Sequence, residues 1–345
     1  NLPPWKKDEK NRLVIFEFKE PVPVRSIHLQ MQEDSERHAV KLSISDNGTD
    51  WKPLGSAGRW RKHFLPSREE RIEGFQEQTA RYVKLDFDPP KPEVGMKLYE
   101  LNFQSARLGS LHTKAARQRT QPSISDPSTQ TIPGDQCIKL GQILDLTDRL
   151  QPDGTLDYQL PAGQWTIVRF GHTTNGNKIH PASERSEGLE TDKMSAEATK
   201  FHLDKGLLGP TLRSLGNLVG KVMVEANIDS WEANCQTWTS KFPEEFQKRI
   251  GYDMRKWLPA LTGRIVEDVD QTERFLWDYR RTIGDLIAKN FYGTFREYVN
   301  GWGMKLSAEA PGIGIPIQSD QLQILGQLDI PQGEFWLGPK KDPRF

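Results

Sequence analysis

Polar and apolar residues alternate along much of the first hundred residues. The alternation covers residues 13–18, 24–31, 40–44 and 81–87. Because successive side chains of a strand point to opposite faces of its sheet, a period of two predicts half-buried antiparallel strands. An Asp-Asn-Gly-Thr-Asp run at 46–50 predicts a turn, since Asn and Gly tolerate positive φ. The region therefore predicts a β-sandwich.

The alternation stops between residues 105 and 134, where Lys, Arg, Ser, Thr, Pro and Gln predominate. This composition is typical of a solvated connector. Three short alternating runs follow, at 143–147, 156–160 and 164–170. They predict further strands, which either complete the first sandwich or form a small one of their own.

From about residue 171 the apolar period changes from two to about 3.6, which predicts helices. Residues 240–250 are expected to form one helix, with Ser240 as its N-cap and Gly251 as its stop signal. Asp253 is expected to cap a second helix that runs to residue 261.

The clearest helical pattern begins at Asp270, where Asp270 and Glu273 have the spacing of a capping box. Gly301 and Gly303 are expected to end this helix. One apolar stripe runs along it through Leu276, Tyr279, Ile283, Leu286, Ile287, Phe291 and Phe295. A stripe of this kind predicts a helix that covers a buried core.

Short apolar runs at 222–224, 304–306 and 327–330 flank these helices. Strand-helix alternation predicts parallel strands joined by helical crossovers. The second half of the chain is therefore α/β, whereas the first part is all-β.

A glutamate follows each of these three runs: Glu232, Glu309 and Glu334. In a parallel barrel the carboxyl ends of all strands open on one face, so we expect the three side chains to converge. Glycoside cleavage needs one protonated carboxyl group and one ionised carboxylate. Trp231 and Trp336 supply apolar neighbours that raise a carboxyl pKa and stack on sugar rings. A single glutamate after a strand is more often a solvated loop residue, so the pattern alone leaves both interpretations open.

Composition excludes several other classes of function. Lys+Arg 47 balance Asp+Glu 47, which removes the positive field on which nucleic-acid binding depends. No apolar run has the length of a membrane span. Cys137 and Cys235 are too far apart in sequence for a zinc motif, and His172, His180 and His202 do not have the spacing of one.

An ordered set of sequence blocks in the second half resembles glycoside hydrolase family 106. The blocks are Gly-Leu-Glu-Thr-Asp-Lys at 188–193, Asp-Ser-Trp-Glu at 229–232, the stretch 246–253, and Leu-Ser-Ala-Glu at 306–309. The resemblance covers roughly residues 155–336. It implies an inverting α-L-rhamnosidase that removes terminal rhamnose from an oligosaccharide or polysaccharide, with a calcium ion at the active site. It also implies a secreted or periplasmic protein.

Several roles follow from this resemblance. Glu232 is expected to be the general acid and Glu334 the general base, with Glu309 as the alternative base or as a calcium ligand. The residues expected to bind substrate are Glu190, Asp229, Trp231, Trp238 and Trp336. Asp192 and Lys193 are expected to stabilise the loop between the substrate-binding residues.

The resemblance also implies the domain organisation. Residues 45–51 and 80–85 resemble a galactose-binding-like, discoidin-type sandwich. We expect this sandwich over residues 1–125, a linker with short strands over 126–170, and a partial (β/α)8 barrel over 171–345 that is preceded by or carries the sandwich.

A complete barrel takes about 250 residues, so we expect its remaining strands before Asn1 and after Phe345. The alternative function is a non-catalytic carbohydrate-binding protein, or a truncated scaffold fragment.

Overall fold

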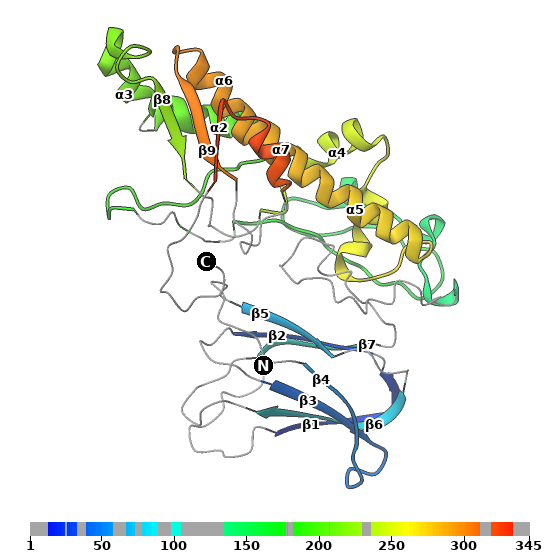
Figure 1. The fold of residues 1–345 in the computed structure, drawn as a ribbon. Coiled ribbons are helices and arrows are strands. Elements are labelled where there is room, and N and C mark those ends of the chain that lie inside the picture. The colour runs from blue at the N-terminus through cyan, green and yellow to red at the C-terminus, as the bar shows by residue number, and fades with distance from the viewer. Residues whose placement is uncertain are drawn as a thin grey trace. The chain divides into compact units, whose positions relative to one another are not determined.

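The computed structural model of the chain describes residues 13–24, 26–32, 39–57, 67–72, 78–88, 98–104, 134–174, 176, 178, 182–206, 208–229, 236–310 and 319–333 (Figure 1). These residues divide into two compact units, one of residues 13–104 with 134–136 and one of residues 137–333. Backbone hydrogen bonds explain why the segment after residue 136 belongs to the second unit. Ile138 N–H donates to the Ile265 carbonyl (2.8 Å), and Glu267 N–H donates to the Ile138 carbonyl (2.8 Å).

Two antiparallel sheets make up the described first unit. One has the order β1 (Leu13–Val24), β6 (Gln78–Asp88), β3 (Ala39–Ser45) and β4 (Lys52–Ala57). The other has the order β5 (Ser67–Ile72), β2 (Ser26–Gln32) and β7 (Leu98–Gln104). The predicted strands at 13–18, 40–44 and 81–87 are confirmed.

Both sheets of the first unit contribute to one apolar core. Ile27 of β2 packs in the same cluster as Val40, Leu42, Val83 and Leu85 of β3 and β6, and all five side chains are buried. The predicted turn at 46–50 is present between β3 and β4. The Asn47 Oδ1 atom accepts hydrogen bonds from Thr49 N–H and Asp50 N–H, both 2.9 Å, and Gly48 has a φ of 79°.

A three-stranded parallel sheet is the framework of the second unit. Its order is β10 (Ile330–Gln332), β9 (Lys305–Glu309) and β8 (Glu225–Ile228). The described helices are α2 (Ala196–Lys205), α3 (Leu208–Leu215), α4 (Phe242–Ile250), α5 (Val269–Leu286), α6 (Thr294–Asn300) and α7 (Gln321–Leu325). Helices lie between β8 and β9 and between β9 and β10 in sequence, as the predicted crossovers require. The fold of this unit is mixed α/β.

The strands of this sheet begin later than expected. The run 222–224 precedes β8, because Val222 N–H donates to the Leu218 carbonyl (2.8 Å) in a turn. In the run 327–330 only Ile330 belongs to β10, because Gln327 N–H donates to the Ile324 carbonyl (2.8 Å) in the turn that ends α7.

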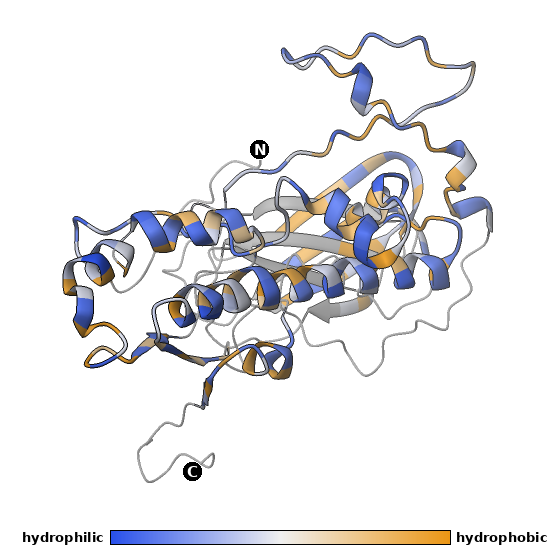
Figure 2. Cartoon of the chain, turned by 90° about the horizontal axis from the view of Figure 1, so that it is seen from above, coloured by the Kyte–Doolittle hydropathy of each residue, from blue (hydrophilic) through white to orange (hydrophobic). Residues whose placement is uncertain are grey.

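The long helix of the second unit contains a feature that the sequence pattern did not predict. α5 continues through a π-helical segment, η6 (Ile287–Gly293), into α6 without a break. The apolar stripe is confirmed, because its residues from Leu276 to Phe291 are buried; Figure 2 shows apolar and polar residues alternating along the helix. The predicted cap is wrong by two residues: Asp268 is the N-cap, and it accepts a hydrogen bond from Gln271 N–H (2.7 Å).

Two other helix predictions need correction. α4 begins after Lys241, so Ser240 does not cap it, although Gly251 ends it in the left-handed conformation (φ 97°) as expected. The second predicted helix is a 3-10 helix, η5 (Arg255–Thr262). Pro259 inside it lacks the N–H that a regular α-helix needs.

The strands predicted at 143–147, 156–160 and 164–170 are absent. All of these residues are described, and only an isolated bridge between Leu150 and Leu156 occurs there. A strand requires a hydrogen-bonding neighbour, which periodicity alone does not reveal. Ile167 is accordingly 65% exposed.

Candidate functional site

The carboxyl ends of the three parallel strands lie at the same edge of the sheet. Gln332 of β10 pairs with Glu309 of β9. Ile228 of β8 pairs with Ala308, and Asp229 follows Ile228 directly. The register therefore places Asp229, Glu309 and Gln332 in one row across this edge.

Polar side chains of all three strands meet on one face of the sheet. The Asn227 side-chain amide donates to Ser307 Oγ (2.9 Å) and to Gln332 Oε1 (2.6 Å). Ser307 is fully buried (0% exposed), although it lies between the apolar Leu306 and Ala308. Since register partners in a parallel sheet share a face, the row with Glu309 belongs to this polar face.

Four of the expected site residues lie outside the described residues: Trp231, Glu232, Glu334 and Trp336. Glu232 comes three residues after Asp229, and Glu334 comes two residues after Gln332.

Glu190 and Lys193 form an ion pair in the loop before α2. The Lys193 side chain is 3% exposed and the Glu190 side chain 25% exposed. Burial lowers the pKa of Lys193, and the nearby carboxylates of Glu190 and Asp192 oppose that shift. The Lys193 ammonium also lies 5.2 Å from the centre of the Phe291 ring, on the side of the π-helical segment.

Asp192 joins this loop to the residues that precede α4. One carboxylate oxygen accepts hydrogen bonds from Met194 N–H (3.0 Å) and from the Gln236 side-chain amide, and the other accepts the Thr239 hydroxyl (2.6 Å). The Gln236 side-chain oxygen in turn accepts Lys193 N–H (3.0 Å). We call Asp192, Gln236 and Thr239 the loop clamp. The predicted loop-stabilising role of Asp192 agrees with these contacts.

Trp238 lies within the clamped segment. Its ring stacks on the Phe242 ring, with the ring centroids 5.2 Å apart. The His172 ring is tilted against the Trp238 ring, with the centroids 6.3 Å apart. Trp238 is half-buried, so part of its surface stays accessible. Thr237, next to it, accepts a hydrogen bond from the Tyr279 hydroxyl of α5 (2.6 Å).

Sequence reasoning missed Gln236 and Asn290. The Asn290 side-chain amide, in the π-helical segment, donates to the Met194 carbonyl (2.7 Å) and so ties the loop to this helix. Its polar character next to the apolar Phe291 was the available signal. Gln236 had none, because its partners lie more than forty positions away in sequence.

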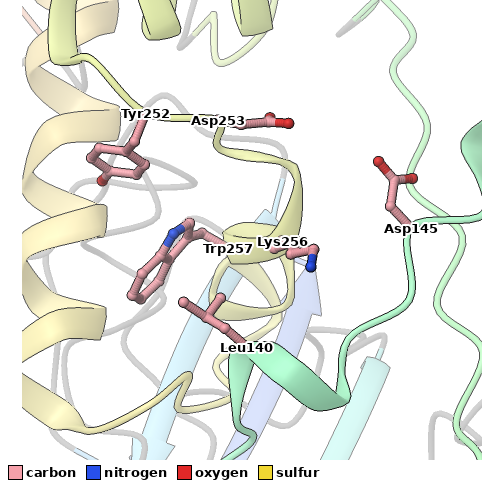
Figure 3. A pocket seen from close by; sticks show the side chains of 6 residues that line it. All are labelled: Leu140, Asp145, Tyr252, Asp253, Lys256 and Trp257. Carbon is pink, nitrogen blue, oxygen red and sulfur yellow. The ribbon is translucent and has the colours of Figure 1, made fainter.

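A separate cavity of about 410 Å³ lies elsewhere in the second unit (Figure 3). Its lining residues are Leu140, Asp145, Tyr252, Asp253, Lys256 and Trp257. Arg255 donates hydrogen bonds to Asp253 and lowers its pKa, which is the wrong direction for a general acid. The Tyr252 hydroxyl donates a hydrogen bond to the Asp278 carboxylate (3.1 Å). None of the predicted site residues lines this cavity, so we do not assign the reaction to it.

A sequence model of glycoside hydrolase family 106, described as alpha-L-rhamnosidase, matches residues 25–343. The chain belongs to glycoside hydrolase family 106. The family resemblance of the sequence blocks is thereby confirmed, whereas the discoidin-type assignment of the first unit stays a prediction.

Two relatives illustrate the family membership. A protein of Formosa agariphila named "Putative beta-glucuronidase" is 41% identical over 281 residues, which are 81% of this chain and 22% of the relative. The solved rhamnosidase from Novosphingobium sp. PP1Y superposes with a TM-score of 0.71 at 28% identity, over 93% of this chain and 30% of that chain. The chain thus spans less than a third of the length of either protein.

Proposed function

We propose that this family 106 chain forms part of an inverting α-L-rhamnosidase that hydrolyses a terminal rhamnose from an oligosaccharide or polysaccharide. The observation that carries the proposal is the row of Asp229, Glu309 and Gln332 at one edge of a parallel sheet. Glu232 and Glu334 follow the outer two strands of that sheet within a few residues. Acids from separate parts of the chain therefore leave the sheet at the same edge.

Glu232 is the proposed general acid. It donates its proton to the glycosidic oxygen as the bond to the sugar breaks, while the general base removes a proton from the attacking water. An inverting enzyme holds its two carboxyl groups about 6.5–9.5 Å apart, to leave room for that water. The family resemblance favours Glu334 as the base, with Glu309 as the alternative base or a metal ligand.

The remaining site residues have binding roles in this proposal. Glu190 and Asp229 accept hydrogen bonds from sugar hydroxyl groups. Trp231, Trp238 and Trp336 provide apolar surfaces for the sugar rings.

The name of the Formosa relative raises β-glucuronide cleavage as a second candidate function. The described polar face argues against it. Asn227, Ser307 and Gln332 are neutral, and Asp229 and Glu309 are acidic, so none of these described side chains supplies a positive charge to pair with the carboxylate of a uronic acid. A neutral sugar such as rhamnose fits the face better.

Calcium binding is also part of the proposal. Asp229 and Glu309 are oxygen donors of the kind that calcium takes. The described residues contain no group of three or more His, Cys, Asp or Glu side chains suited to a metal ion. A calcium site at this edge therefore needs further donors, and we route no step of the reaction through the ion. Chelation followed by dialysis should lower activity and melting temperature; unchanged values of both contradict calcium binding.

The parallel sheet is proposed to be part of a (β/α)8 barrel, and the two-sheet unit to be a sandwich attached to it or inserted in it. A secreted or periplasmic location suits a polysaccharide substrate. Among the described helices, none is long and apolar enough to cross a membrane. The alternative of a non-catalytic carbohydrate-binding protein is tested by the same assays.

The decisive experiment replaces the acids one at a time in the natural polypeptide that contains this sequence. Glu232→Gln should lower turnover of an alkyl α-L-rhamnoside about 10²- to 10⁴-fold, because general acid assistance contributes that much. Glu334→Gln and Glu309→Gln then show which of the two glutamates is the base. Azide, as an external nucleophile, should restore turnover in the variant that lacks the base. Near-normal turnover by Glu232→Gln, or wild-type activity on an aryl β-glucuronide alone, contradicts the proposal.

A further inference from the structure

A buried lysine, Lys193, forms an ion pair with the Glu190 carboxylate. Lys193 is 3% exposed, and a buried ammonium is costly unless it is paired. Its partner Glu190 is 25% exposed, so the pair has one inaccessible end and one accessible end. Lys193 contacts the Oε2 atom of Glu190. An arrangement of this kind presents a carboxylate to a ligand while its charge is balanced from behind.

Three further residues, Gln236, Asn290 and Phe291, contact Lys193 or the residue that follows it. Its backbone N–H donates to the Gln236 side chain (3.0 Å), within the loop clamp. Asn290 fixes the following residue, Met194, through its carbonyl (2.7 Å). The Phe291 ring lies 5.2 Å from the ammonium.

Two of these contacts come from the π-helical segment η6. Such segments insert an extra residue into a helix and occur frequently at functional sites. Asn290 and Phe291 are adjacent residues of η6, and both face the loop that carries Glu190 and Lys193. The π-helical segment therefore contacts the loop that carries the buried ion pair.

We propose that Lys193 is a positioning residue that holds the Glu190 carboxylate in a single orientation, as the acceptor for a hydroxyl group of the sugar. The inference rests on the proposed function and adds a residue that acts on the substrate through Glu190. A contact that is equal in the ground state and the transition state affects KM and not kcat, so loss of the Glu190 orientation should raise KM and leave kcat nearly unchanged.

A double-mutant cycle tests the inference in the natural polypeptide, with 4-nitrophenyl α-L-rhamnoside as the probe. Glu190→Gln should raise KM about 10- to 100-fold, the range expected for a hydrogen bond to a charged group. Lys193→Met should raise KM similarly. The double variant should show no further increase, because both changes remove the same contact.

Thr282→Val is the matched control. Thr282 is fully buried in α5, and its hydroxyl donates to the Asp278 carbonyl (2.8 Å), a contact that involves no residue of the loop clamp. This change should lower the melting temperature without altering KM. If Lys193→Met does not fold, Lys193→Gln replaces it, since glutamine retains a donor in the buried position.

The outcomes separate the two proposals. An unchanged KM in the lysine variant, or effects that multiply in the double variant, overturns the positioning role while the rhamnosidase assignment stands. Absence of rhamnosidase turnover in the wild type, or full activity of Glu232→Gln on an alkyl α-L-rhamnoside, overturns the proposed function itself.

Discussion

The sheets of the two units differ in how buried and exposed side chains follow one another along a strand. In β6 of the first unit, Val83 and Leu85 are fully buried and alternate with the more exposed Tyr82 and Lys84. In β9 of the second unit, Leu306, Ser307 and Ala308 are buried in succession, as in parallel sheets covered on both faces. The first pattern is explained by one apolar core. The second includes a polar face with one fully buried serine, Ser307, which a core alone does not explain.

This difference indicates what each sheet is for. Apolar side chains on one face stabilise the first unit through burial. The polar face of the second sheet carries an amide, a hydroxyl and carboxylates that end at one edge. Substitutions on the two sheets should therefore separate stability from activity.

The largest expected effect is on the stability of the first unit. Leu85→Ala should lower its free energy of unfolding by about 2–5 kcal/mol, because the change leaves a cavity in a fully buried position. Lys41→Ala, at an exposed position of the neighbouring strand β3, should change it by less than about 0.5 kcal/mol. Urea unfolding measures both. The comparison breaks if Leu85→Ala leaves stability intact but abolishes turnover measured below the unfolding transition.

The next effect concerns the polar face. Asn227→Leu removes the hydrogen bonds to Ser307 and Gln332 but leaves the strand register intact. We expect kcat/KM to fall about 10- to 100-fold, the range for loss of a site hydrogen-bond network. Asn227 is exposed, so the melting temperature should change little. A large loss of stability with normal kcat/KM contradicts the distinction between the two sheets.

The smallest effect sharpens the comparison through pH. Hydrogen bonds from Gln271 lower the pKa of Asp268, the N-cap of α5. A lowered native pKa means that the stabilisation is present above the unfolded pKa of about 3.9 and is lost as pH falls through the native value. Asp268→Ala should lower the melting temperature by about 2–4 °C at pH 7. The difference from wild type should shrink toward pH 3 in calorimetric scans, and a constant difference at every pH contradicts the assignment.

Sequence patterns predicted those parts of the fold in which local signals and burial agree. The strands of the first unit and the apolar stripe of the long helix are such cases. The pattern at 164–170 failed, because alternation does not show whether a neighbouring strand exists. The cap was misplaced because Asp268 and Asp270 both precede the same stripe, and only backbone geometry distinguishes them.

The candidate site was predictable in part. The alternation of helices and strands predicted parallel strands with Glu309 at their carboxyl edge, and Glu309 lies there. Asp229 was expected only from the family resemblance. The loop clamp did not follow, because Asp192 reaches Thr239 across forty-seven positions. The π-helical segment escaped as well, since its single-residue irregularity leaves the apolar stripe intact.

A crystal structure of the natural polypeptide with rhamnose bound tests the central claim most directly. We expect the sugar at the carboxyl edge of β8, β9 and β10, with a hydroxyl group within hydrogen-bond distance of Glu190 and the anomeric carbon between Glu232 and Glu334. Rhamnose bound instead in the cavity beside Tyr252 and Trp257, with the carboxyl edge empty, would contradict the account.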